Sequence, residues 1–386
     1  MRRFRRKLPA KASGFSLIEL MIAMVLGLLV LAAVIQLFLG SKATYTSNEA
    51  LARVQENGRF SLELLKREFR DSSSRGFCAA RLAVQNHLDT DCSSHPDTFF
   101  AAEQAVMGWD FTGTERGDDY TLPADLSADG IAVNQWSAQL SDGSAESLPS
   151  WLQNRVVPGS DVIVIRRPEV VPGIAADVSA WAGAGADELY VTAPHGLEVG
   201  EIALVTNCST GVDLFQNTGT GEQLNRSGGS CNSTGPGNST SFGQWATAYD
   251  QSMQLFRIRV LAYYIGMNAT TQEPGLYRYD VTSGTAEELV SGVENMQILF
   301  GYSNTADDGG DGQTVNHWLP ASEVPNWEFV IGARLALLVR SPENMGDGTT
   351  QQTFDLASTS VTHQEDGRLR QLFFSSISLR NRQLVM

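Results

Sequence analysis

Residues 14–20 read Gly-Phe-Ser-Leu-Ile-Glu-Leu and open an apolar run that continues to Leu39. Between Leu20 and Ile35 no side chain is charged or strongly polar. An α-helix rises about 1.5 Å per residue, so residues 15–39 form a rod of roughly 37 Å, long enough to cross a hydrocarbon core of about 30 Å. The sequence therefore predicts a membrane-spanning helix over residues 15–39.

Glu19 lies one turn inside this helix, where a carboxylate costs about 2.5–3.5 kcal/mol at mid-bilayer and less near an interface. An acid at this position therefore needs a partner. The segment before the span carries cations and no acid, which places the N-terminus in the cytoplasm and everything after Leu39 outside it. The cations are Arg2, Arg3, Arg5, Arg6, Lys7 and Lys11.

Two common kinds of N-terminal segment are alternative interpretations that give Glu19 no special role. A secretory signal peptide has an apolar core of about 7–15 residues, shorter than this run, although Ser41-Lys42-Ala43 fits a cleavage site. A plain signal anchor, with Glu19 reaching toward the lipid headgroups, accounts for charge and length. It does not account for the order Gly-Phe-x-x-x-Glu.

A basic leader ending in Gly14, followed by Phe15 and then by Glu19 in an apolar helix, resembles the class III signal of type IV prepilins and type II secretion pseudopilins. The resemblance implies cleavage by the prepilin peptidase between Gly14 and Phe15, with N-methylation of the Phe15 amine. It also implies that Glu19 meets the free amine of a neighbouring subunit, since opposite charges attract strongly at low dielectric. Gln36 stands where many major pilins have proline.

Beyond the span, apolar residues recur every three or four positions and define one stripe of a helix. We therefore expect the membrane helix to continue as an amphipathic half over residues 40–76, ending between Ser73 and Gly76, with glycine as a typical C-terminal stop. Residues 55–70 and 76–78 resemble the post-membrane helix of PilW-type minor pilins. The stripe consists of Leu51, Val54, Gly58, Leu62, Leu65 and Phe69.

The remainder, residues 77–386, is predicted to be a β-rich domain with long loops at 77–160 and 206–250. In residues 253–265, Phe256, Ile258 and Val260 alternate with polar side chains, which is the period of a strand. The pattern favours an α+β fold in which the long N-terminal helix packs on antiparallel β-sheet, as in pilins and pseudopilins. Predicted strands lie at 162–165, 189–192, 202–205, 253–265, 275–281, 296–302, 329–340 and 369–379.

The 386-residue chain has a formal charge of −15. Loss of the six leader cations leaves 22 of its 28 basic residues against 43 acidic ones, a formal charge of −21. This acidic balance argues against nucleic acid or anionic lipid as a partner of the exported part.

The four cysteines form two local pairs in sequence, Cys78 with Cys92 and Cys208 with Cys231. Neither pair has the spacing of a redox or zinc motif. In an oxidising compartment we expect two local disulfides that close loops of about 15 and 24 residues, each contributing on the order of 3 kcal/mol. Four buried thiols are the alternative.

No stretch indicates catalysis, and we expect neither an enzyme nor a cofactor. The five histidines are dispersed, and the sequence has no nucleophile elbow, phosphate-binding loop or dinucleotide fingerprint. The acidic turn at residues 307–312 is a candidate calcium loop, but Gly309 and Trp318 replace two of the expected carboxylates. A solvated hairpin loop is the favoured interpretation of this turn.

Residues 292–302, 333–341 and 373–382 also resemble the PilW family. The resemblance implies a minor pilin that is incorporated into a type IV pilus and helps to initiate its assembly. Its partners would be the prepilin peptidase, other minor pilins, the major pilin and a tip adhesin where one is present. It would be stored as a single-pass protein of the bacterial inner membrane, with its C-terminal domain in the periplasm. After assembly it would be part of the pilus.

Two alternatives stay open. A J-like minor pseudopilin of type II secretion shares the signal but is usually much shorter. A periplasmic binding or adhesive domain on a signal anchor belongs to a different functional class, and the N-terminus of the mature protein distinguishes it from a pilin.

Overall fold

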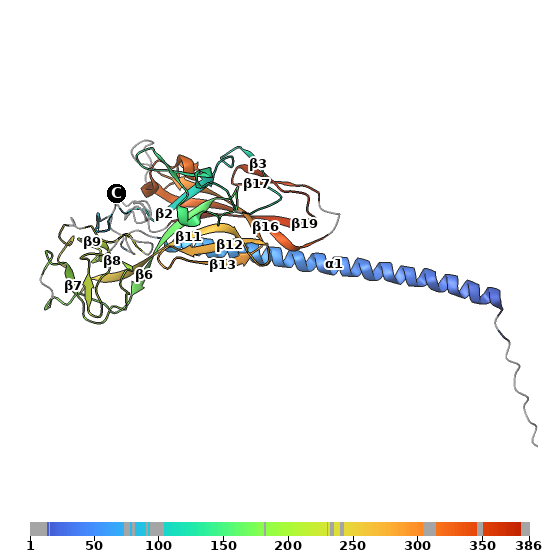
Figure 1. Cartoon of the computed structure of the whole chain (residues 1–386), viewed down its shortest axis with the longest axis horizontal. Helices are drawn as coiled ribbons and strands as arrows, with labels where there is room; N and C mark the ends of the chain where they lie inside the picture. The colour runs from blue at the N-terminus through green and yellow to red at the C-terminus, as the bar shows by residue number, and fades with distance from the viewer. Residues whose placement is uncertain are drawn as a thin grey trace, which may run out of the picture. The chain divides into compact units, whose positions relative to one another are not determined.

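The computed structural model describes residues 14, 16–72, 78, 82–89, 92, 104–127, 129–180, 183–229, 231, 235–239, 243–303, 314–345 and 350–379. One long helix is followed by short and long strands, which confirms the predicted α+β class (Figure 1). The basic leader, Phe15 and the acidic turn at 307–312 lie outside the described residues.

The helix α1 (Leu17–Asp71) contains the predicted membrane-spanning half and the predicted amphipathic half in one element. It ends at Asp71, before the predicted stop at 73–76, and residues 73–77 lie outside the described part. The chain divides into two compact units, Met1–Leu51 and Ala52–Met386. This division differs from the predicted boundary after residue 76, because the apolar stripe from Val54 to Phe69 is buried in the core of the second unit.

The largest sheet has ten strands in the order β1-β9-β8-β11-β6-β2-β4-β5, with β12 pairing on β11 and β13 on β12. Only β1 and β9 run parallel among the described pairs of this sheet. The strands are β1 (Val84–Asn86), β2 (Val106–Phe111), β4 (Trp136–Gln139), β5 (Ala145–Ser147), β6 (Val162–Val171), β8 (Ile202–Thr206), β9 (Val212–Gln216), β11 (Gln254–Met267), β12 (Pro274–Asp280) and β13 (Thr285–Ser291).

Three smaller sheets complete the second unit. In the four-stranded antiparallel sheet β15-β14-β16-β19, the long strands β16 and β19 lie side by side (Figure 1). Its strands are β14 (Val293–Tyr302), β15 (His317–Leu319), β16 (Val330–Asn344) and β19 (Arg368–Ser378). The other two sheets are β17 (Thr353–Leu356), β18 (Thr359–Thr362) and β3 (Asp119–Thr121), and the pair β7 (Glu188–Tyr190) and β10 (Gln223–Asn225).

In the described part of the chain, four short 3-10 helices lie between the strands. They are η1 (Val133–Gln135), η2 (Ser150–Leu152), η3 (Ala321–Glu323) and η4 (Trp327–Phe329).

The main core lies between the amphipathic part of α1, the large sheet and the four-stranded sheet, and includes Leu65, Phe69, Val260 and Leu337. A second core, with Phe215 and Trp245, lies around β7, β8 and β9. A third, smaller core packs β17 and β18 against one face of β16.

All eight predicted strands are present as β6, β7, β8, β11, β12, β14, β16 and β19. The prediction of long loops was wrong in part: residues 77–160 contain β1 to β5, and residues 206–250 contain β9 and β10. Most of these strands have only three to five residues, too few to show a period, and the longer β2 lacks a polar face. All six residues of β2 are buried, so its sequence, Val-Met-Gly-Trp-Asp-Phe, has no solvent-exposed polar face.

Candidate functional site

A reciprocal pair of hydrogen bonds closes the start of α1. The backbone N–H of Glu19 donates to Ser16 Oγ at 3.3 Å, and the backbone N–H of Ser16 donates to Glu19 Oε2 at 3.5 Å. This is a capping box, which satisfies two of the amide donors that the first turn of a helix leaves open. The sequence reasoning did not assign Ser16 this role, although the Ser-x-x-Glu spacing signals it.

The positions predicted for processing lie next to this cap. Gly14 is exposed, and Phe15 lies outside the described residues. Glu19 is also exposed, in the first turn of α1, where the helix dipole favours a negative charge. Its carboxylate therefore has a local partner in Ser16 and remains open to a second, charged partner.

The apolar half of α1 is uncovered. Its large hydrophobic side chains between Leu17 and Leu39 are 49–77% exposed. Within the described residues, α1 is the helix that is long and apolar enough to span a membrane. An apolar surface of this extent requires lipid or protein as cover.

The last turns of α1 are fixed to the sheets by polar contacts as well as by the apolar stripe. Arg167 on β6 donates through Nη1 to both carboxylate oxygens of Glu68, at 3.1 and 3.2 Å. Its Nη2 donates to Glu169 at 2.9 Å. Asn57 donates its side-chain N–H to the Ser291 carbonyl at 2.9 Å, so α1 also contacts the end of β13.

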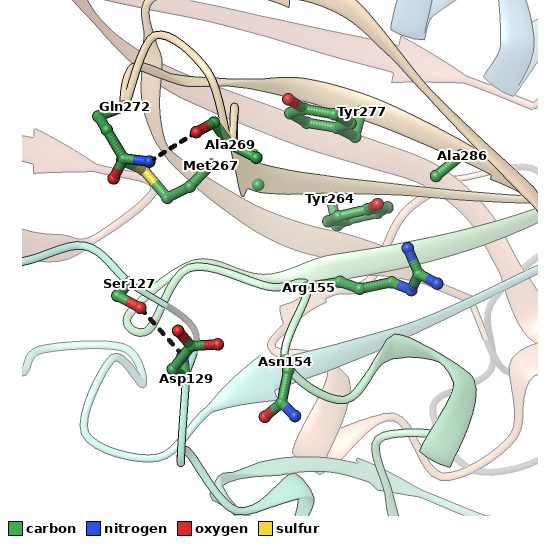
Figure 2. A pocket seen from close by; sticks show the side chains of 11 residues that line it. Ser127, Asp129, Asn154, Arg155, Tyr264, Met267, Ala269, Gln272, Tyr277 and Ala286 are labelled. Atoms are coloured by element: carbon green, nitrogen blue, oxygen red, sulfur yellow. Dashed lines mark hydrogen bonds between the residues drawn. The ribbon is translucent and has the colours of Figure 1, made fainter.

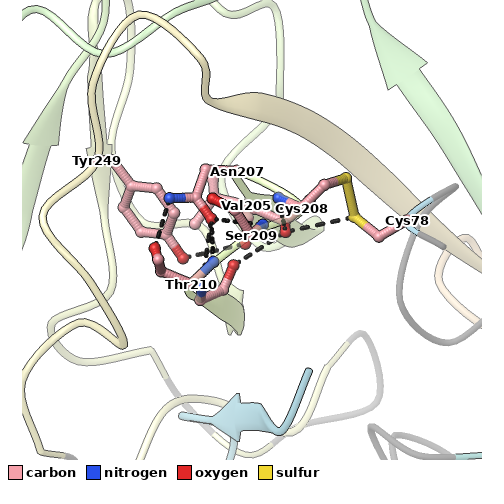
Figure 3. Close-up of a disulfide and its surroundings, with 9 residues drawn as sticks. Cys78, Val205, Asn207, Cys208, Ser209, Thr210 and Tyr249 are labelled. Carbon is pink, nitrogen blue, oxygen red and sulfur yellow. Dashed lines mark hydrogen bonds between the residues drawn. A yellow bond between two sulfur atoms is a disulfide. The ribbon is translucent and has the colours of Figure 1, made fainter. Parts of the chain in front are cut away.

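The disulfide pairing predicted from sequence was wrong. Cys78 bonds to Cys208 and Cys92 to Cys231, across separations of 130 and 139 residues. All four cysteines are in disulfides, as expected, and none is free. Figure 3 shows the first bridge beside the turn at 207–211, where Asn207 Oδ1 accepts the backbone N–H groups of Ser209 and Thr210.

The parallel pairing of β1 with β9 explains the long-range bridges. It places residues 84–86 beside 212–214, and the backbone N–H of His87 continues the pairing by donating to the Leu214 carbonyl. Each cysteine therefore faces a distant segment across this strand pair. Proximity in sequence could not reveal this arrangement, because β1 has only three residues.

Behind β9 lies a buried polar cluster that the sequence did not indicate. His87 Nε2 lies 2.6 Å from Asp213 Oδ1, and the hydroxyl of Tyr249 donates to Asp213 Oδ2. The guanidinium of Arg226 lies 4.4 Å from the ring centroid of Trp245 and 3.0 Å from His87 Nδ1. Burial, with the nearby Asp213 charge, raises the pKa of Tyr249, which keeps the hydroxyl a neutral donor.

A histidine and an aspartate at this distance have the geometry of a general-base pair. Both side chains of the His87–Asp213 pair are 0% exposed, however, so no substrate reaches them. Their role in this structure is to hold β1 against β9 and the segment that carries Tyr249. Among the described residues, no group of three His, Cys, Asp or Glu side chains is placed to hold a metal ion.

Comparison with protein families gives two matches. Residues 9–35 match the prokaryotic N-terminal methylation motif. Residues 262–381 match the family model of type IV pilus-assembly protein W, PilW. This C-terminal region is therefore similar to PilW. Comparisons with curated proteins and with solved structures gave no match.

The PilW match begins within β11 and includes β12 to β19, and therefore the whole four-stranded sheet. Together with the methylation motif it supports a pilin function related to the type IV pilus, in which the protein is a structural component and other pilus components are its partners. The motif and the uncovered apolar helix fit a membrane-anchored pilin. Both disulfides and the His87 cluster lie outside the two matched regions.

Proposed function

We propose that this chain is a minor pilin that is cleaved between Gly14 and Phe15, N-methylated at Phe15 and inserted through α1 into a type IV pilus, whose assembly it helps to initiate. One observation carries the proposal. The helix that begins in the methylation motif is uncovered and apolar at one end, while its other end is built into the main core of the second unit, which includes strands of the region that matches PilW.

Before assembly, lipid would cover the apolar half of α1 in the inner membrane, with the second compact unit in the periplasm. In a fibre, the corresponding helices of neighbouring subunits would replace lipid. Both surroundings are apolar, so the exchange involves little change in hydrophobic free energy. The charge of Glu19 then favours transfer from the membrane into the fibre, because the amine of a neighbouring subunit is a better partner for a carboxylate than lipid.

The size of the second unit supports a minor rather than a repeating subunit. It runs from Ala52 to Met386 and contains a large region, outside the two family matches, that inserts β1 to β10 between α1 and the PilW domain. A domain of this size is easier to accommodate where a subunit occurs once, such as the end of a fibre, than at every step of a helical lattice. Other minor pilins and the major pilin would be its direct partners.

The N-terminus of the mature protein tests the first part of the proposal. Mass spectrometry of the chain recovered from sheared pili should give a peptide that starts with N-methylated Phe15. The chain should be scarce relative to the major pilin, and its deletion should sharply reduce the number of pili.

An intact Met1 on the functional envelope protein would overturn the proposal in favour of a plain anchor. A deletion that leaves pili unchanged and blocks export of secreted proteins would instead favour a type II pseudopilin.

A further inference from the structure

A cavity of 320 Å³ opens beside the turn that joins β11 to β12 (Figure 2). The β-strands supply two tyrosines to its lining, Tyr264 and Tyr277. Two loop segments supply polar groups, from Ser127 and Asp129 in one and from Asn154 and Arg155 in the other. Figure 2 shows the tyrosines on one side of this space and Asn154 and Asp129 on the other.

The aromatic side of the cavity is fixed. The rings of Tyr264 and Tyr277 are stacked, with centroids 5.7 Å apart and an interplanar angle of 24°. The Tyr277 hydroxyl donates to Glu288 Oε2 at 3.2 Å, which sets the position of the ring. Gly266 lies against both rings, since a Cβ at this position would stand 2.9 Å from Tyr277 and 3.0 Å from Tyr264.

The polar side is also held in place. Asn154 has a left-handed backbone (φ 59°), a conformation that few residues other than glycine adopt, and this presents its amide at the cavity. Arg155 Nε donates to the Trp151 carbonyl at 3.0 Å, and its guanidinium carbon lies 5.4 Å from the ring centroid of Tyr279. The cavity therefore has one fixed cation in its lining.

Asp129 supplies the opposite charge, so the lining carries one cation and one anion together with two amides, Asn154 and Gln272, and the hydroxyls of Ser127 and the two tyrosines. This balance does not favour a phosphate or an amine. The lining instead offers charged and neutral hydrogen-bond donors and acceptors beside an aromatic surface. A site that orients a small molecule combines these two elements: an apolar or aromatic wall and a few fixed polar groups.

We propose that this cavity binds a neutral sugar ring. The C–H face of a hexopyranose packs on an aromatic ring, and its hydroxyl groups both donate and accept, as Asn154, Arg155 and Asp129 require. The cavity falls in the size range of small-molecule sites, about 300–1,000 Å³, and is at the lower end suited to one or two sugar rings. The inference does not depend on pilus assembly.

The two sides of the cavity have different origins. Tyr264 and Tyr277 lie inside the region that matches PilW, whereas Ser127, Asp129, Asn154 and Arg155 lie outside it. The choice among sugars would therefore be made by side chains outside the region that matches PilW.

The proposal can be tested with the full chain in detergent. Saturation-transfer NMR would measure binding of glucose, galactose and N-acetylglucosamine, each alone, with inorganic phosphate and N-acetylneuraminic acid as charged comparisons. Tyr277→Leu removes the ring and keeps an apolar side chain, while Tyr277→Phe keeps the ring. Asn154→Gly removes the amide and tolerates the left-handed backbone, while Gln153→Ala changes an exposed neighbour outside the lining.

We expect saturable binding of at least one neutral sugar, weakened fivefold or more by Tyr277→Leu and by Asn154→Gly, weakened less by Tyr277→Phe, and unchanged by Gln153→Ala. Thermal melting of each variant shows whether it is folded, and the two independent substitutions keep the test decisive if one is not. Absence of binding by all three sugars, binding insensitive to both substitutions, or tighter binding of either charged compound would overturn the proposal.

Discussion

Gly58 on α1 lies directly against the ring of Phe373 on β19, so closely that a Cβ on Gly58 would overlap the ring. The glycine belongs to the buried stripe of the helix, between Val54 and Leu62. Its missing side chain lets α1 approach the four-stranded sheet. The apolar stripe that predicts an amphipathic helix thus contains the glycine at which α1 lies against the Phe373 ring.

Whether Gly58→Ala raises or lowers the free energy of unfolding should depend on the side chain at position 373. Alanine favours a helix over glycine by about 1 kcal/mol, but overpacking costs about 1–3 kcal/mol. In the natural background we expect Gly58→Ala to destabilise the chain by up to about 2 kcal/mol, and in a Phe373→Ala background to stabilise it by about 1 kcal/mol. Urea unfolding in detergent measures both, with the exposed Arg59→Ala as control; the same sign in both backgrounds would contradict the contact.

The ion cluster around Glu294 gives a second stability prediction. Glu294 on β14 accepts from Arg340 at 3.1 Å and from Arg370 at 2.7 and 2.9 Å, and the side chains of Glu294 and Arg370 are 3% and 2% exposed. Glu294→Gln leaves two buried cations with one anion fewer, which should cost about 3–5 kcal/mol.

Arg53→Ala is the matched control, because it removes an exposed pair with Glu343 (3.3 Å) and should cost less than about 1 kcal/mol. Equal unfolding midpoints for the two variants would show that burial does not determine how much the ion cluster around Glu294 contributes to stability.

Two buried carboxylates predict a pH dependence. Burial raises the pKa of Asp110 to about 6 although Ser322 donates to it, and burial together with the Asp110 charge raises the pKa of Asp161 well above its ordinary value. The folded state therefore binds protons more strongly than the unfolded state. The stability that Asp110 contributes is complete below pH about 4 and is lost as the pH rises through about 6, a change of roughly 3 kcal/mol at most.

Asp110→Asn keeps an oxygen acceptor for Ser322 and removes the titration. Relative to the natural chain, this variant should gain stability as the pH rises from 4.5 to 7.5. The exposed Asp125→Asn should show no such trend. Urea midpoints at the two pH values measure the difference, and a constant difference for Asp110→Asn would refute the assignment.

The features that the sequence predicted well are those with local signals. The periodic stripe of α1 is visible from residues three and four apart, and strands such as β11 show alternation over many residues. The match to the methylation motif covers residues 9–35, and the PilW match covers the end of β11 and the strands that follow it. Short buried strands such as β2 carry no period, and they were predicted as loop.

Features formed by distant segments could not be predicted in this way. The pairing of Cys78 with Cys208 depends on the parallel contact of β1 with β9. The cavity near Tyr277 combines Ser127 and Asp129 with residues 154–155 and with residues between 264 and 286. In both cases the segments are separated by tens of residues without any shared pattern. Only the folded arrangement of the sheets brings them together.

Thiol counting tests the disulfide pairing. Cys78→Ser combined with Cys208→Ser removes one bridge and should leave no free thiol in the denatured, unreduced protein. Cys78→Ser combined with Cys92→Ser breaks both bridges and should leave two. Local pairing would give the reverse counts, two free thiols for the first variant and none for the second.

The two roles of Glu19 can be separated by substitution. Glutamine at the third position of a helix completes a capping box as glutamate does, but it has no charge to offer an amine. Ser16→Ala removes the cap and keeps the charge. If pairing with a neighbouring amine drives assembly, Glu19→Ala and Glu19→Gln should both be cleaved normally and then be lost from sheared pili, while Ser16→Ala should be incorporated. Wild-type recovery of Glu19→Gln in the pilus fraction, measured by immunoblot against the membrane fraction, would instead assign the acid to capping alone.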